Sequence, residues 1–157
     1  MDRAPDIAEG KTCGECGLCC KLIGVKSLAK PQSVWCRSYR KGSGCQIYHD
    51  RPDDCRAFIC YWLHLPNLGD DWRPDRCGFL MHIAEGGSRL NIEVDQGSAQ
   101  AWRHEPFYST SRGWAAKGGP RGLTLLVWIG RRCIEIQPDR EVDYGLVRPA
   151  SDRARRV

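Results

Sequence analysis

Long apolar runs are missing from this sequence of 157 residues. The longest, Leu123 to Ile129, is far shorter than the roughly 20 residues that a helix needs to cross a bilayer. The first residues carry Asp2, Asp6 and Glu9 and no apolar core, so no secretory signal peptide is expected. We therefore expect a cytoplasmic protein that makes no contact with a membrane.

Familiar catalytic signatures are also missing. The chain has no nucleophile elbow, phosphate-binding loop, dinucleotide fingerprint or His-Glu-x-x-His motif. No catalytic residue is predicted, and whether the protein is an enzyme stays open.

The charge of the chain is only mildly unbalanced, at net +5, which permits an acidic partner without indicating nucleic-acid binding. With 41% hydrophobic and 27% charged residues, the composition is that of a globular protein and excludes wholesale disorder.

What the sequence has in excess is cysteine, with ten residues of this type. Thiols stay reduced in the cytosol, so clustered cysteines there are metal ligands more often than disulfides. Cys77 and Cys133 stand apart beside apolar residues and are expected to be buried free thiols. The others gather in the first 60 residues, and we predict that they ligate metal: Cys13, Cys16, Cys19, Cys20, Cys36, Cys45, Cys55 and Cys60.

The spacing of these cysteines favours more than one metal or a shared cluster. Cys13-x2-Cys16 lets one tight turn direct two thiolates at a single cation. Cys19 and Cys20 are adjacent and point in different directions on an extended chain, so they can hardly serve one tetrahedral site. Two sites of four cysteines would suit Zn²⁺, and iron or an Fe–S cluster equally. His64 is an alternative ligand at most.

Two segments carry a family resemblance. Residues 13–20 read Cys-Gly-Glu-Cys-Gly-Leu-Cys-Cys, and residues 45–60 read Cys-Gln-Ile-Tyr-His-Asp-Arg-Pro-Asp-Asp-Cys-Arg-Ala-Phe-Ile-Cys. Both resemble the YkgJ-type cysteine-cluster family, a CxxCxxCC domain described as zinc- or iron-chelating. The resemblance covers residues 13–62 and implies metal chelation by the eight cysteines named above. Similar clusters occur in flagellin lysine methylases, for which an iron–sulfur role has been proposed.

The predicted fold class is α+β, organised as one compact unit. A flexible lead-in (1–12) precedes the cysteine-cluster module (13–64), a small α+β half follows (77–147), and a basic tail ends the chain (148–157). Within the module, the segment from Arg51 to Leu63 is the clearest helix. In the second half we expect a small antiparallel sheet with a helix packed on one face. Its strands are predicted at 79–84, 90–95, 123–129 and 133–137, with the helix beginning near Pro106.

The leading hypothesis is a metal-binding protein in which Zn²⁺, slightly preferred over iron, is mainly structural. Arg51 and Arg56 would offset the negative charge of the thiolates, and Tyr48, Phe58 and Trp62 are expected to pack around them. A protein partner of unknown identity is expected. The first alternative is an iron–sulfur redox or catalytic protein. The second is a zinc-dependent module that binds nucleic acid through its basic tail.

Overall fold

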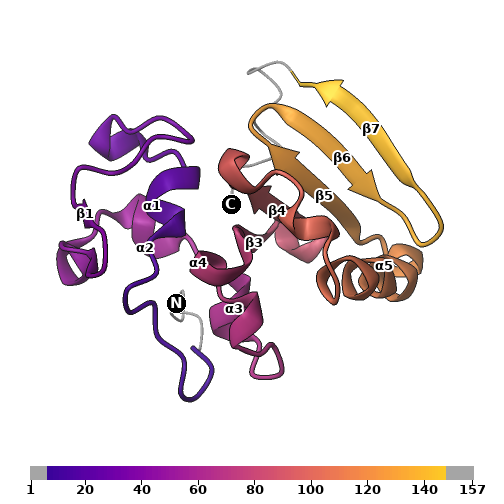
Figure 1. Cartoon of the computed structure of the whole chain (residues 1–157), viewed down its shortest axis with the longest axis horizontal. Helices are drawn as coiled ribbons and strands as arrows, with labels where there is room; N and C mark the ends of the chain where they lie inside the picture. The colour runs from indigo at the N-terminus through magenta and orange to yellow at the C-terminus, as the bar shows by residue number, and fades with distance from the viewer. Residues whose placement is uncertain (1–6, 148–157) are drawn as a thin grey trace.

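The computed structural model describes residues 7–147 of the chain. Figure 1 shows a cysteine-rich half of short helices and loops, in indigo to magenta, beside a sheet that carries the last strands. The helices and strands of the first half are α1 (Leu18–Leu22), β1 (Tyr39–Arg40), β2 (Gly44–Cys45), α2 (Asp53–Ala57), α3 (Tyr61–His64) and α4 (Pro74–Cys77). Those of the second half are β3 (Phe79–Ala84), β4 (Arg89–Val94), α5 (Phe107–Gly118), β5 (Thr124–Ile129), β6 (Arg132–Ile136) and β7 (Glu141–Leu146).

The second half forms one sheet in the order β3-β4-β5-β6-β7. The predicted hairpin of β3 and β4 is confirmed, and so is the α+β class. The sheet is mixed rather than wholly antiparallel, because β4 and β5 run parallel. The connection between them includes α5, and a crossover of this length is what a parallel pair requires. The fifth strand, β7, pairs with β6 and was not predicted from the sequence.

The main hydrophobic core lies on one face of the sheet. Alternate residues of the strands point into it, among them Ile92 and Val127, which are almost fully buried. Ala115 of α5 packs on the same core, as predicted for this helix, and so do Trp62 and Leu63 of α3. The first half therefore contributes to the core of the second instead of forming a core of its own.

The predicted helix from Arg51 to Leu63 is wrong as a single element. It is two short helices, α2 and α3, separated where Phe58 and Cys60 adopt extended backbone angles. Pro52 precedes the first turn of α2, which holds Asp53 and Asp54 as the helix dipole favours. The break changes the direction of the chain between Cys55 and Cys60, so the angle that a continuous helix would impose on these two cysteines does not apply.

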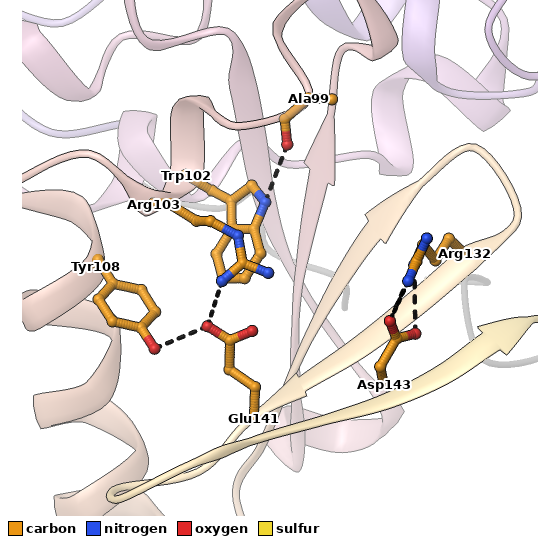
Figure 2. Close-up of polar contacts among 7 residues, drawn as sticks. All are labelled: Ala99, Trp102, Arg103, Tyr108, Arg132, Glu141 and Asp143. Atoms are coloured by element: carbon orange, nitrogen blue, oxygen red, sulfur yellow. Dashed lines mark hydrogen bonds and ion pairs between the residues drawn. The ribbon is translucent and has the colours of Figure 1, made fainter.

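Polar contacts attach β7 to the rest of the second half (Figure 2). Glu141 accepts hydrogen bonds from the Arg103 guanidinium and from the Tyr108 hydroxyl, the latter at 2.7 Å. Arg132 and Asp143 form an ion pair across β6 and β7. No residue of this strand is fully buried, so these contacts are important for an edge strand with little apolar burial.

The other face of the sheet carries buried polar groups beside the cysteine-rich half. His82 on β3 is 1% exposed, and its Nε2 lies 3.4 Å from a carboxylate oxygen of Glu93 on β4. Asn91 accepts a hydrogen bond from the Trp128 indole at 3.0 Å. The prediction that His82 is a strand residue is confirmed.

Lys11 holds the described part of the lead-in against α3. Its ammonium group donates hydrogen bonds to the carbonyls of Trp62 and Leu68, at 2.8 and 2.7 Å, and also to that of Leu65. The remainder of the predicted lead-in, residues 1–6, and the basic tail, residues 148–157, lie outside the described residues. Between residues 7 and 147, no helix is long and apolar enough to span a bilayer.

Candidate metal centre

The cysteine-rich loops fold back on one another through close backbone contacts. Gly44 has φ +78°, and a Cβ atom there would lie 2.5 Å from the carbonyl oxygen of Gly14. A Cβ atom at Gly17 would collide with the Tyr39 ring. Glycine is therefore needed at 17 and 44, because only a residue without a side chain lets the β1–β2 hairpin approach the first CxxC turn this closely.

All eight predicted cysteines line the same cavity, of about 650 Å³. They reach it from different parts of the chain: the CxxC turn, α1, the loop before β1, β2, α2 and the start of α3. The described structure contains no disulfide at any of them, since all ten cysteines are free. The cysteines that the sequence scatters over 48 positions are thus neighbours in the fold.

The thiols border the cavity without converging on one point. Among the residues that the structure describes, no group of three or more His, Cys, Asp or Glu side chains is arranged so that it could hold a metal ion. The donor set itself fits a thiophilic metal, because it consists of eight sulfur atoms. A bound Zn²⁺ would require the thiols to lose protons and move closer together.

Burial and contacts between the thiols shift the pKa values of several cysteines in the cavity. Burial raises the pKa of Cys60 to about 12. A hydrogen bond to Cys20 and burial raise the pKa of Cys19 well above its ordinary value. The same hydrogen bond, assisted by Cys45 and by the charges of Lys30 and Arg51, lowers the pKa of Cys20 to about 7 although burial opposes it. The Cys20 thiol is therefore ready to ionise near neutral pH, while Cys19 and Cys60 hold their protons.

Cations lie beside these thiols, only partly as predicted. Arg51 stacks over the Tyr48 ring at 3.8 Å and interacts electrostatically with the thiols of Cys13 and Cys20, in accord with the predicted charge balance. Arg56 is exposed and donates to the backbone carbonyls of Arg51 and His49.

The sequence analysis did not predict that Lys30 belongs to the site. Its side chain is buried, and its ammonium group donates hydrogen bonds to the carbonyls of Lys21 and Ile23. The same group interacts electrostatically with four of the cysteines. One sequence signal could have found it: from Lys21 to His49 the chain has six Lys or Arg and no Asp or Glu.

Other residues singled out in the sequence lie around or away from the cavity. His49, His64, Tyr48 and Phe58 line it, whereas Trp62 packs into the main core. Cys77 and Cys133 are buried as predicted, in two different hydrophobic clusters. Comparison of the chain with protein-family models, with curated proteins and with solved structures found no match in any of the three.

Proposed function

We propose that this protein binds metal through the thiolates of Cys13, Cys16, Cys19, Cys20, Cys36, Cys45, Cys55 and Cys60, and that the metal is mainly structural. The observation that carries the proposal is the shared cavity that all eight cysteines line. Eight sulfur donors in one place suit Zn²⁺ or iron far better than hard cations, which take oxygen ligands. The resemblance of residues 13–62 to the YkgJ-type family supports the same class of function.

A structural role follows from how little else supports this half. Its strands have two residues each and its helices no more than five, so regular hydrogen bonding contributes little to its stability. Its few buried apolar residues pack mostly on the sheet half or on Leu80 of β3. Metal–thiolate bonds supply the missing cross-links when bound, as they do in zinc-stapled domains.

The charge of the site also fits thiolate ligands. A Zn²⁺ ion with four cysteine thiolates carries about −2, so two such ions leave a strong local negative charge. Lys30 and Arg51 lie beside the thiols and would offset part of it. Zn²⁺ is preferred over iron because a stabilising cross-link is best made by an ion that does not change its oxidation state.

Metal content and the visible spectrum of protein purified without oxygen test this proposal. About two zinc ions per chain and no visible absorbance are expected. Iron with acid-labile sulfide would overturn the zinc assignment in favour of an iron–sulfur protein. Reduced protein that binds no metal ion would overturn the proposal as a whole.

The structural role has its own test. Replacing Cys16 with Ser should lower the metal content and the far-ultraviolet circular dichroism signal together. The matched control is Cys133→Ser, which removes a buried thiol outside the cavity and should leave the metal content unchanged. Full metal content in Cys16→Ser, or unaltered helicity after metal loss, would contradict a structural metal.

A further inference from the structure

The eight cysteines differ in what lies behind them. Cys13 and Cys60 pack against the main core, and Cys16 and Cys19 pack against the small cluster of Leu18, Leu22 and Leu80. The remaining cysteines of the cavity pack against no hydrophobic cluster of the described residues: Cys20, Cys36, Cys45 and Cys55. Hydrophobic packing therefore divides the cysteines into an inner set (Cys13, Cys16, Cys19, Cys60) and an outer set (Cys20, Cys36, Cys45, Cys55).

The electrostatic neighbours of the thiols follow the same division except at Cys20, which forms a hydrogen bond with Cys19 of the inner set. The Cys60 thiol interacts with Cys16 and Cys13, which are both in the inner set. Cys55 interacts with the whole remainder of the outer set: Cys20, Cys36 and Cys45. Cys20 also interacts with Cys19 and Cys13, so it lies where the two sets meet.

Backbone hydrogen bonds assemble the outer set from distant parts of the chain. The amide of Cys36 donates to the carbonyl of Cys20 at 2.8 Å, which brings the two residues together. The amide of Tyr39 donates to the carbonyl of Cys36 at 3.1 Å, and Tyr39 pairs with Cys45 across β1 and β2. Backbone hydrogen bonds thus link three of the four outer cysteines to one another, although Cys20 also shares α1 with Cys19 of the inner set.

The segments that carry the two sets of cysteines also differ in how much apolar surface they bury. The inner set is backed by apolar side chains, and Cys60 directly precedes α3, which is packed into the main core. In the outer set, Cys45 lies on the two-residue strand β2 and Cys55 on α2, where none of the residues is buried, whereas Cys20 shares α1 with Cys19. Segments with few buried apolar contacts open locally at a lower free-energy cost, and opening exposes their ligands to competitors.

Positive charge is concentrated around the outer set. Among the cysteines, Lys30 interacts most strongly with Cys36 and Cys20, and Arg37, Arg40 and Lys41 are exposed in the segment between Cys36 and Cys45. An anionic metal acceptor would be attracted to this surface, at a rate that falls with added salt.

We infer that the eight thiols form two centres of four, and that the outer centre exchanges its metal while the inner centre retains it. This inference rests on the proposed function, since it assigns different roles to two parts of the same site. The metal of the inner centre then cross-links and stabilises the cysteine-rich half. The outer centre is the place where metal can pass to or from an anionic, thiol-containing or carboxylate-containing acceptor.

Zinc release from the full chain tests the division. Protein reconstituted with Zn²⁺ is mixed with an excess of an anionic chelator, and the released ion is followed with time. Two phases of equal amplitude are expected, with rates at least about tenfold apart, a difference that a modest change in barrier produces. The fast phase should slow as salt is added. Release of both ions in one phase would overturn the inference.

Substitutions identify the centres, and Cys55 and Cys60 are a matched pair only five positions apart. Cys55→Ser, and independently Cys45→Ser, should abolish the fast phase and leave one slowly released zinc ion per chain. Cys60→Ser should instead remove the slow phase. Loss of both ions in Cys55→Ser and in Cys45→Ser would indicate one shared cluster and overturn the division, although metal binding itself would stand. Wild-type reduced protein that takes up no zinc would overturn the proposed function and the division together.

Discussion

The ring of Phe58 packs edge-on against the imidazole of His82, with ring centroids 5.4 Å apart and an interplanar angle of 61°. Phe58 lies in the break between α2 and α3 and lines the thiol cavity, whereas His82 is buried on β3. This contact joins the cysteine-rich half to the sheet at the point where the chain turns from Cys55 towards Cys60. The ring therefore closes the cavity on the side of the sheet.

Replacing Phe58 with Ala should lower the free energy of unfolding. The loss should fall below the ~3–5 kcal/mol typical of a fully buried Phe, because this side chain is only half-buried. Phe58→Leu, which keeps most of the apolar volume, should cost less. Urea unfolding followed by tryptophan fluorescence measures both variants, and equal stabilities for wild type and Phe58→Ala would show that the contact contributes nothing.

Lys11 makes a second connection between distant segments. Its ammonium group bonds three carbonyls and lies 4.7 Å from the centre of the Trp62 ring. Lys11→Met keeps the length of the side chain and removes the donors, which leaves polar groups short of partners and should cost about 1–3 kcal/mol. The matched control is Lys41→Met on an exposed loop, which should stay within about 0.5 kcal/mol of wild type. Equal effects of the two substitutions in chemical denaturation would argue against an anchoring role.

Glu141 should make the free energy of unfolding depend on pH. Burial opposes ionisation, but hydrogen bonds from Arg103 and Tyr108 prevail and lower its pKa below the ordinary 4.5. A carboxylate with a lowered pKa stabilises the fold fully above pH 4.5, and this contribution is lost as pH falls through the pKa in the folded state. Glu141→Gln should therefore be destabilised by about 1 kcal/mol at pH 7 and should approach wild type in acid.

Thermal unfolding at a series of pH values measures this difference. The control is Asp71→Asn, which alters an exposed carboxylate away from β7 and should leave stability at pH 7 nearly unchanged. A gap between wild type and Glu141→Gln that stays constant down to strong acid would contradict the assigned role of the charge.

The pattern of apolar residues along the sequence predicted most of the strands of the second half. The alternation around Leu90 and the apolar run ending at Ile129 each correspond to a strand, because one face or both faces of these segments are buried. The parallel pairing of β4 and β5 could not be read in this way, since it depends on where the chain returns after α5. β7 was missed because none of its residues is fully buried, so the strand leaves little hydrophobic signal.

The candidate site was predictable as a set of residues and not as an arrangement. Spacing and resemblance identified eight cysteines, and the structure places all of them around one cavity. The break at Phe58 and the burial of Lys30 arise from tertiary packing, which outweighs helix propensity and the usual exposure of lysine. For the same reason, the division into inner and outer sets follows from contacts between segments far apart in the chain.

Cys20 should react before Cys60 and Cys77 in the reduced, metal-free protein. Its hydrogen bond with Cys19 is the main cause that lowers its pKa to about 7, so about half of this thiol is ionised at neutral pH. Burial raises the pKa values of Cys60 and Cys77 to about 12, and their thiols should stay protonated. Because the thiolate is the nucleophile, brief treatment with iodoacetamide at pH 7 should label Cys20 well before these two, as peptide mass spectrometry can show. In urea the local environments are lost, and all three should then react at similar rates. If Cys20 is labelled no faster than Cys60 in the folded protein, its contacts with Cys19, Lys30 and Arg51 do not activate it.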